Sequence, residues 1–334
     1  MRVACISGPG RITVENVADP RPAAADAVVK VRHATICGSD LTILAGKMAG
    51  VGYPLVPGHE WVGEVIETAP EHHHLRGRIV VSDLLEHCGG CTFCSRGQPN
   101  LCDHLVEPGL TRPGAFAEYV AVRASNLLVL PDEIPLRQAA LIEPLAVALY
   151  ALERVPVSEG ETVAIFGGGG IGQLIARCCL AAGAHVGLAD PHPHRRASAT
   201  AHGCTALPAG DELPAAWLDA GLFPPDVVFE ASGDPAGLHL AVDLAAKGGR
   251  IGLVGYGGTR RVHLMPSKIM SKALSISGVL SPTGTWHAAI SNVRTGRISL
   301  AGLLTHEFPL ERTAEAFACA AERADGAIRV GIAP

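Results

Sequence analysis

Long apolar runs are missing from this 334-residue chain, although 48% of its residues are hydrophobic and its mean hydropathy is +0.27. A membrane-spanning helix needs roughly 18 uninterrupted apolar residues. The richest stretch, residues 139–152, is broken by Glu143 and Pro144. The first eight residues also lack the apolar core of a signal peptide. We therefore expect a globular, cytoplasmic protein with no membrane partner.

The chain also lacks a large excess of positive or negative charge. The net charge is −5, and the chain has no lysine-rich run or basic stripe. Nucleic acid and anionic membrane surfaces are therefore not expected partners. Ten cysteines without an export signal are typical of a reducing compartment and of metal binding. The length suits two domains better than one core.

Four of the ten cysteines fall within fifteen residues, in the pattern Cys-x2-Cys-x2-Cys-x7-Cys formed by Cys88, Cys91, Cys94 and Cys102. Spacings this short let one loop arrange four thiolates around a single Zn²⁺. Because four sulfur ligands leave no coordination position for a substrate, the pattern predicts a structural zinc site. Disulfides or unliganded thiols are the alternative, but disulfide frameworks belong mainly to small secreted chains.

The pattern of the chain changes after Pro131. Before it, short β-branched runs separated by glycine and proline predict a barrel-like β domain, with strands at 11–14, 28–31, 62–66, 78–81 and 117–122. After it, strands alternate with helices, which predicts an α/β domain with a doubly wound parallel sheet. We expect strands at 163–166, 185–190, 204–207, 226–231, 250–256 and 274–280, and helices at 139–154, 171–182, 193–202 and 235–246. The tail, with helices expected at 286–295 and 311–323, is predicted to return to the first domain.

The first strand of the second region ends in the run Gly167-Gly168-Gly169-Gly170-Ile171-Gly172. Gly167, Gly169 and Gly172 match the spacing G-x-G-x-x-G. In this motif the first glycine makes the turn, the second admits a pyrophosphate, and the third packs the helix on the strand. Gly170 and Ile171 would begin a helix whose free N–H groups and positive dipole end hold the diphosphate. A flexible glycine loop in a non-binding domain is the alternative.

Asp190 ends the next expected strand, eighteen residues after the motif. A carboxylate in this position accepts hydrogen bonds from both adenosine ribose hydroxyls and repels a 2′-phosphate, which predicts NAD rather than NADP. Arg195 is expected to stack beside the adenine, or else to lie on a solvated helix face. Ser232 and Val254, from the fourth and fifth strand segments, complete the predicted cofactor-binding set.

Three separate segments offer ligands for a second, open metal site. Cys37 follows one expected strand, His59 and Glu60 precede another, and Glu143 begins a helical segment. One thiolate, one imidazole and carboxylates form a plausible catalytic zinc site with room for water or substrate. Taken singly, Cys37 could be a core thiol, His59 a structural histidine, and Glu143 a carboxylate at a helix N-terminus.

Together these features resemble the zinc-dependent medium-chain alcohol dehydrogenases over essentially the full length. The resemblance rests on the four-cysteine lobe, Cys37-Gly38-Ser39-Asp40, Gly58-His59-Glu60 and the nucleotide fold downstream. It implies a GroES-like β-barrel catalytic domain at 1–145 and 282–334, with a structural-zinc lobe at about 86–104, and a Rossmann NAD-binding domain at 146–281. It also implies two zinc ions per chain, NAD as cofactor, and a homodimer or homotetramer.

The resemblance assigns roles to single residues. Cys37 and His59 match zinc ligands, and Glu60 matches a neighbouring carboxylate that can ligate directly. Glu143 stands where simple alcohol dehydrogenases have a second cysteine and polyol dehydrogenases have a glutamate. Asp40 matches the carboxylate that orients the histidine.

Ser39 matches the hydroxyl that passes the substrate proton to the cofactor ribose, and beyond it the sequence departs from the family. Thr42 stands where many relatives carry the last histidine of the proton relay, so the proton is expected to leave through water. The segment 67–76 carries His72, His73 and His74 in place of the usual glycine pattern. Because adjacent residues point in different directions, we interpret the run as a solvated loop rather than a metal site.

The resemblance implies oxidation of a secondary alcohol: Zn²⁺ lowers the pKa of the hydroxyl, and the hydride passes to nicotinamide. Segments 143–149, 229–233, 252–256 and 304–308 look most like the cyclitol and polyol branch, particularly the 2-deoxy-scyllo-inosamine dehydrogenases of antibiotic biosynthesis. The expected substrate is therefore a small-molecule cyclitol or aminocyclitol, and sorbitol-type and threonine-type enzymes are alternatives. A non-catalytic NAD-binding sensor or scaffold is a further alternative, which predicts a damaged metal site.

Overall fold

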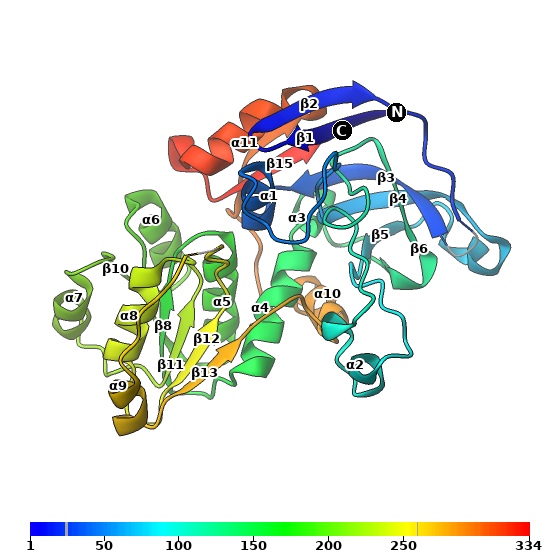
Figure 1. Cartoon of the computed structure of the whole chain (residues 1–334). Helices are drawn as coiled ribbons and strands as arrows, with labels where there is room; N and C mark the ends of the chain where they lie inside the picture. Colours follow the sequence, from blue (N-terminus) through cyan, green and yellow to red (C-terminus); the bar gives the residue numbers. More distant parts are fainter. Residues whose placement is uncertain (24–25, 259) are drawn as a thin grey trace. The chain divides into compact units, whose positions relative to one another are not determined.

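The chain folds into two compact units (Figure 1). The structure, a computed structural model, describes residues 1–23, 26–258 and 260–334. The first unit comprises Met1–Glu143, Ala289–Arg294 and Leu304–Pro334, and the second comprises Pro144–Ala288 and Thr295–Leu303.

Two tail segments, 282–288 and 295–303, group with the second unit, whereas the sequence predicted residues 282–334 in the first domain. Hydrogen bonds explain this difference. Arg177 donates to the carbonyl oxygens of Ser299 and Ala301, and the hydroxyl of Thr285 donates to the carbonyl oxygen of Ala146 at 2.8 Å.

A mainly antiparallel sheet forms the frame of the first unit, with strand order β14-β15-β3-β4-β5-β7 and β6 also paired with β3. The ten-residue strand β3 pairs with three neighbours, and its register shifts twice against β4, as bulges allow in a strongly bent strand. β1 and β2 form a separate hairpin. The bounds are β1 Arg2–Gly8, β2 Arg11–Asn16, β3 Asp26–Thr35, β4 Glu60–Thr68, β5 Ile79–Ser82, β6 Tyr119–Arg123, β7 Leu127–Val129, β14 Leu304–Pro309 and β15 Arg329–Ala333. The predicted β-rich first region is confirmed, and Leu304–Pro334 group with it.

The core of the first unit lies between this sheet and α11 (Thr313–Glu322). Phe116 meets Phe317 of α11 edge-on, with 5.8 Å between the ring centroids, and Trp61 of β4 is 3% exposed. Burial of this apolar surface holds the ends of β3 and β4 in place. These strand ends matter because the predicted metal ligands lie just after the end of β3 and at the start of β4.

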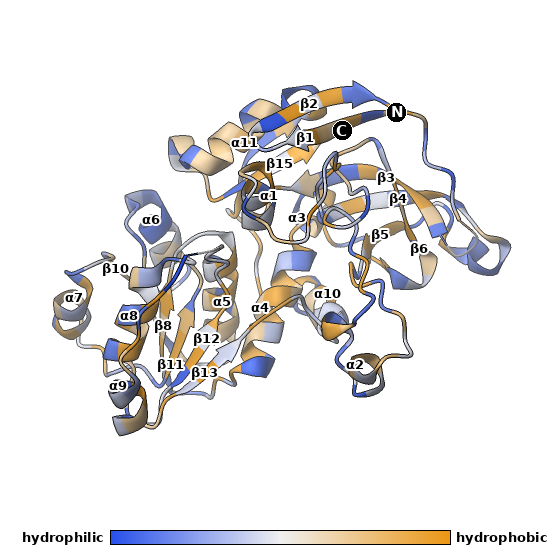
Figure 2. Ribbon diagram, in the orientation of Figure 1, coloured by the Kyte–Doolittle hydropathy of each residue, from blue (hydrophilic) through white to orange (hydrophobic). Residues whose placement is uncertain are grey.

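A six-stranded parallel sheet with strand order β10-β9-β8-β11-β12-β13 forms the second unit, as predicted. Figure 2 shows apolar residues concentrated in its central strands, and every residue of β8 is buried. The strands are β8 Thr162–Phe166, β9 His185–Ala189, β10 Thr205–Leu207, β11 Val227–Glu230, β12 Arg250–Leu253 and β13 Ser275–Gly278. The strand order reverses between β8 and β11, and α/β sheets bind ligands beyond the carboxyl ends of the strands at such a reversal.

Helices connect the parallel strands. In Figure 1, α8 and α9 lie along one side of the sheet, and α4 and α5 along the other. The bounds are α4 Ile142–Arg154, α5 Gly170–Ala181, α6 Pro193–Ala201, α7 Leu213–Asp219, α8 Pro235–Leu244, α9 Pro266–Ser271 and α10 Trp286–Arg294. No helix in the described ranges is long and apolar enough to cross a membrane.

Several local predictions need correction. The helix expected at 139–154 is two helices, α3 (Leu136–Ala139) and α4, and the first turn of α4 holds Pro144, which a helix tolerates there. The histidine run lies on a short 3₁₀ helix, Pro70–Leu75, anchored by buried Leu75, rather than in a loop. The short helices α1 (Gly38–Leu44), α2 (Thr92–Ser95), α7 and α9 were not predicted, because few-turn helices leave little periodicity in a sequence.

Candidate active site and metal centres

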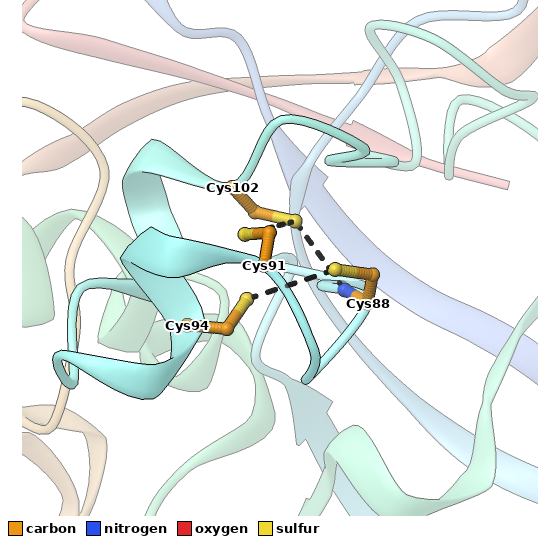
Figure 3. A group of neighbouring side chains, drawn as sticks. All are labelled: Cys88, Cys91, Cys94 and Cys102. Atoms are coloured by element: carbon orange, nitrogen blue, oxygen red, sulfur yellow. Dashed lines mark hydrogen bonds between the residues drawn. The ribbon is translucent and has the colours of Figure 1, made fainter.

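The four clustered cysteines converge on one point (Figure 3). Their sulfur atoms all lie within 4.8 Å of one another. The Sγ atoms of Cys88 and Cys94 are 4.0 Å apart, and those of Cys91 and Cys102 are 3.9 Å apart. A tetrahedron with Zn–S bonds of about 2.3 Å has edges of about 3.8 Å. The sulfur positions therefore fit a closed four-sulfur zinc site.

Backbone N–H groups in this lobe point at the sulfurs. The N–H groups of Cys88 and His104 donate to the Sγ of Cys102, each at 3.3 Å. Hydrogen bonds from the backbone of Cys94 lower the pKa of Cys91 to about 6, whereas desolvation raises the pKa of Cys94 to about 12. Because four closely spaced thiolates would repel one another, a divalent cation at their centre would stabilise their ionised forms. All ten cysteines of the chain are free thiols in the structure, which disfavours the disulfide alternative.

A second cluster brings together Cys37, His59 and Glu60, whose ligand atoms also lie within 4.8 Å of one another. Cys37 sits at the N-terminus of α1, directly after β3, and Glu60 opens β4, the partner of β3. Gly58 precedes them with φ = +98°, and a Cβ there would meet the ring of Phe116 at 2.6 Å. The backbone that presents His59 therefore requires glycine.

Asp40 lies fully buried behind this cluster. Its Oδ2 accepts the N–H of Cys37 at 2.9 Å, and its Oδ1 lies 3.6 Å from Nδ1 of His59. Burial raises the pKa of Asp40 to about 6, against the opposing charge of His59. Asp40 and Cys37 in turn hold the pKa of His59 well above its ordinary value, although burial works the other way. Asp40 therefore faces the ring nitrogen Nδ1, and Nε2 is the nitrogen available to a metal.

Ser39 and Thr42, the predicted proton-relay residues, both lie on α1. The Oγ of Ser39 is 3.3 Å from Nε2 of His59. The hydroxyl of Thr42 donates to the carbonyl oxygen of Gly38 at 3.0 Å, one turn earlier in the same helix. Ser39 therefore lies beside the metal cluster, while the hydroxyl hydrogen of Thr42 is engaged within the helix.

Two residues that the sequence analysis missed hold Glu60. Nη1 of Arg329 donates to both carboxylate oxygens of Glu60 at 2.7 Å, and the hydroxyl of Thr35 donates to Oε2. Arg329 also donates to the carbonyl oxygen of Ile36 at 3.2 Å. All three side chains are nearly inaccessible to solvent. The available sequence signal was a single arginine within the otherwise apolar final strand, β15.

Glu143, in the first turn of α4, is buried and belongs to the same unit as the cluster. Burial, together with the negative charge of Glu60, raises its pKa to about 8, and His59 and Arg329 only partly oppose this. Glu143 does not belong to the group of three mutually close ligand atoms. The half-buried thiol of Cys37, the buried imidazole of His59 and the buried carboxyl groups of Glu60 and Glu143 match the donor chemistry of a catalytic zinc site.

The glycine motif lies in the second unit, at the reversal of strand order. Gly167 has φ = +99°, and a Cβ there would come within 2.8 Å of the backbone nitrogen of Ser232. A Cβ on Gly172 would lie 1.8 Å from the carbonyl oxygen of Gly167. Gly169, Gly170 and Ile171 form the start of α5. The turn therefore requires glycine at 167 and 172, as a loop that holds a pyrophosphate does.

Asp190 follows β9 beside this turn. Its Oδ2 accepts the N–H of Gly168 at 2.8 Å, and Nη1 of Arg195 lies 3.6 Å from the same oxygen. The Arg195 guanidinium lies 3.6 Å from the Cβ position of Gly169 and is mostly covered rather than solvated. Val254 follows β12, and its N–H donates to the carbonyl oxygen of Glu230 at 2.9 Å. The predicted cofactor residues thus gather at the carboxyl ends of β8, β9, β11 and β12.

Comparison with known proteins agrees with this arrangement. The profile of the alcohol dehydrogenase GroES-like domain matches residues 23–132, and that of the zinc-binding dehydrogenases matches residues 170–295. The chain is 30% identical over 327 residues to an L-threonine 3-dehydrogenase of Legionella pneumophila (strain Corby), with 95% of each chain covered. It is 28% identical over 349 residues to a sorbitol dehydrogenase of Bacillus subtilis (strain 168), covering 100% of this chain and 97% of the relative.

Two similar solved structures contain nicotinamide cofactors. A short chain alcohol dehydrogenase (rspB) from E. coli CFT073, complexed with NADH, has a TM-score of 0.93 and 28% identity, with 100% of this chain and 99% of that chain covered. A zinc-binding dehydrogenase from Sinorhizobium meliloti 1021, bound to NADP, has a TM-score of 0.91 and 29% identity with the same coverage. The chain therefore belongs to the zinc-dependent medium-chain alcohol dehydrogenases, NAD-dependent oxidoreductases that combine a GroES-like domain with a Rossmann-type parallel sheet.

Proposed function

We propose that this enzyme oxidises a secondary alcohol on a cyclitol or aminocyclitol, of the 2-deoxy-scyllo-inosamine type, to the ketone. The observation that carries the proposal is the surplus of buried acid around His59. Three buried carboxyl groups, those of Asp40, Glu60 and Glu143, lie near a single arginine, Arg329. A substrate ammonium group beside Glu143 would favour the ionised form of this carboxyl group and would pair with it.

Cys37, His59 and Glu60 would hold the catalytic zinc, with Glu143 beside them. Bound there, Zn²⁺ would act as a Lewis acid on the alcohol oxygen, and NAD would accept the hydride from the alcohol carbon. The hydroxyl proton leaves separately, so one alcohol and one NAD⁺ give one ketone, one NADH and one proton.

The chain's own residues orient and balance this site. Asp40 faces Nδ1 of His59, which leaves Nε2 toward the metal. Arg329 and Thr35 hold the Glu60 carboxylate in one orientation. Ser39, 3.3 Å from Nε2 of His59, is the first acceptor of the alcohol proton. Because the hydroxyl hydrogen of Thr42 is engaged with Gly38, the proton is expected to pass from Ser39 to water.

The second unit would hold the cofactor. Gly167, Gly169 and Gly172, with the N–H groups of Gly170 and Ile171 at the start of α5, would bind the pyrophosphate. Asp190 would accept hydrogen bonds from the adenosine ribose, and Arg195 would lie beside the adenine. Ser232 and Val254, after β11 and β12, would line the nicotinamide half of the pocket.

Two similar proteins favour a polar substrate with several functional groups. They carry the names sorbitol dehydrogenase and L-threonine 3-dehydrogenase, and the second of these substrates is an amino alcohol. A glutamate at position 143 offers two oxygen atoms as hydrogen-bond acceptors, whereas a second zinc-binding cysteine would offer only sulfur, a weak acceptor. Sorbitol and threonine remain the alternative substrates.

We also propose a homodimer or homotetramer in the cytoplasm. β13 is the edge strand of the parallel sheet, and exposed Met270 and Leu280 lie on either side of it in sequence. An edge strand with apolar neighbours is suited to pairing with its copy across a two-fold axis.

Reduction of NAD⁺ by the purified enzyme tests the substrate proposal. Aminocyclitols, inositols, sorbitol and L-threonine would be compared, with NADP⁺ as the cofactor control. We expect kcat/KM to be highest for an aminocyclitol, and Glu143→Gln to lower it at least tenfold for amino substrates but less for inositols, because one charge pair is lost.

Two outcomes would contradict the proposal. If Glu143→Ala leaves turnover and zinc content unchanged, Glu143 has no role at the site. If the enzyme oxidises none of these alcohols and binds only one zinc per chain, a non-catalytic scaffold becomes the better interpretation.

A further inference from the structure

We propose that His192 sets the cofactor preference of this enzyme, by occupying hydrogen-bond acceptor positions on Asp190 that the adenosine ribose of NAD would otherwise use. His192 thereby weakens the preference for NAD and makes the pocket more tolerant of NADP. The inference rests on the proposed role of Asp190 in cofactor binding, but it does not depend on which alcohol is oxidised.

His192 is held against Asp190 by the local backbone. It lies between Pro191 and Pro193 and caps the N-terminus of α6, with φ = −88° and ψ = 121°, the extended region that a following proline favours. Its backbone N–H donates to Oδ1 of Asp190 at 2.8 Å, and its ring Nδ1 lies 2.9 Å from the same oxygen. The two flanking prolines and the two contacts with Oδ1 therefore hold the ring against Asp190.

The contact leaves Asp190 few free acceptor positions. An ionised carboxylate offers about four of them, two on each oxygen. His192 occupies both positions on Oδ1, through its backbone N–H and its ring, and the N–H of Gly168 occupies one on Oδ2. One position remains for the two ribose hydroxyls of NAD. An Asp190 without the imidazole contact would offer two.

Asp190 is ionised in this arrangement. Burial raises its pKa, but the hydrogen bonds from His192 and the charge of Arg195 outweigh burial, and the net pKa lies below its ordinary value. Because an ionised carboxylate only accepts hydrogen bonds, Nδ1 of His192 must carry the hydrogen. The geometry therefore selects this tautomer or the doubly protonated ring.

Positive charges near Asp190 also lower the electrostatic cost of placing a 2′-phosphate beside this carboxylate. Nη1 of Arg195 lies 3.6 Å from Oδ2 of Asp190, and Nη1 of Arg196 donates to the backbone carbonyl oxygen of Asp190 at 2.8 Å. The ring of His194 lies 5.6 Å from that of His192, centroid to centroid. The two arginines thus lie beside the carboxylate and can accept a phosphate in this position, whereas the ring of His194 lies beside that of His192.

The test compares nucleotide binding in matched variants. His192→Ala removes the ring donor but keeps the backbone N–H, whereas His192→Asn keeps a side-chain donor. His194→Ala removes the neighbouring imidazole and serves as the control. Dissociation constants for NADH and NADPH would be measured from nucleotide fluorescence, and kcat/KM for NAD⁺ and NADP⁺ would be measured with a turned-over alcohol.

We expect His192→Ala to raise the ratio of the NADPH to the NADH dissociation constant by about tenfold, the usual effect of one additional hydrogen bond to a charged group. His192→Asn should change this ratio less than about threefold, and His194→Ala should leave it unchanged. An unchanged ratio in His192→Ala, or a shift toward NADPH, overturns the proposal. If that variant does not fold, His192→Phe, which keeps a ring of similar size without the donor, decides in the same way.

Failure of this inference is distinguishable from failure of the proposed function, because nucleotide binding requires no alcohol. If the enzyme binds both nucleotides as expected but oxidises no cyclitol, the proposed substrate is wrong and the proposed role of His192 stands.

Discussion

Arg329 offers a direct test of how the metal cluster is held. The change is Arg329→Met, which removes the guanidinium but keeps most of the side-chain volume. Arg329 is 7% exposed and Glu60 is 1% exposed, and both carboxylate oxygens accept from one guanidinium nitrogen at 2.7 Å. The variant therefore leaves a buried carboxylate whose remaining hydrogen-bond donor is Thr35.

The expected loss in the free energy of unfolding follows from this burial. Breaking a buried ion pair by removing one partner costs about 3–5 kcal/mol, because the remaining charge is uncompensated. The lower end applies here, since bound zinc would neutralise part of the charge on Glu60. The double variant Glu60→Gln with Arg329→Met removes both charges, so it should lose less than the single variant, about 1–2 kcal/mol.

Urea unfolding of the zinc-loaded enzyme measures these values. Trp61, adjacent to Glu60 in β4 and 3% exposed, reports on the first unit through its fluorescence. Because two compact units can unfold separately, the transition of the first unit is fitted by itself. Arg32→Met is the matched control: Arg32 pairs with Glu64 at the surface, so this change should cost at most about 1 kcal/mol.

Two results would refute the reasoning. The first is an Arg329→Met protein within about 0.5 kcal/mol of the wild type, the range of an ordinary surface substitution. The second is a double variant at least as unstable as Arg329→Met alone, which would mean that the loss does not arise from the unpaired charge.

Three further predictions concern the cofactor unit and the cysteine lobe. Gly172→Ala should weaken NADH binding at least tenfold in a fluorescence titration, because the new Cβ would lie 1.8 Å from the carbonyl oxygen of Gly167; unchanged binding would contradict the proposed cradle. Asp190 has a pKa below its ordinary value, so its stabilising contribution is complete above about pH 3.9 and is lost as the pH falls through the folded-state pKa. Asp190→Asn should therefore unfold less steeply than the wild type in acid titrations below pH 4, while losing about 1–2 kcal/mol at pH 7; identical acid unfolding would argue against an ionised Asp190. Cys102→Ser should lower the zinc content from about two ions per chain to about one by metal analysis, and retention of both ions would place the second zinc elsewhere.

Features that depend on residues close together in the chain were predictable. The four cysteines span fifteen residues, so their spacing alone restricts them to one loop. The glycine motif likewise lies between one strand and the next helix, and the steric reason for Gly172 is local, because a Cβ there would meet the carbonyl oxygen of Gly167. The parallel sheet follows from the alternation of strands and helices.

Features that depend on distant partners were not predictable. Nothing near Glu60 in the sequence indicates Arg329, which lies 269 residues away. The pairing arises because β15 packs against β3 antiparallel and brings the end of the chain to the buried end of β3. The short helices α7 and α9 were missed for a different reason, since helices this short owe their stability to packing rather than to their own periodicity.

The sequence by itself determined the family, the four-cysteine motif and the glycine motif, because the residues of each motif lie within a few positions of one another. The ligands of the second metal site come from separate segments and were predicted from the family resemblance. Only the tertiary structure decided how the charges are arranged. It placed Arg329 and Thr35 on Glu60, left Glu143 buried beside a second carboxylate, and fixed His192 against Asp190. Electrostatic balance in a buried site depends on distance and desolvation, and both exist only once the chain is folded.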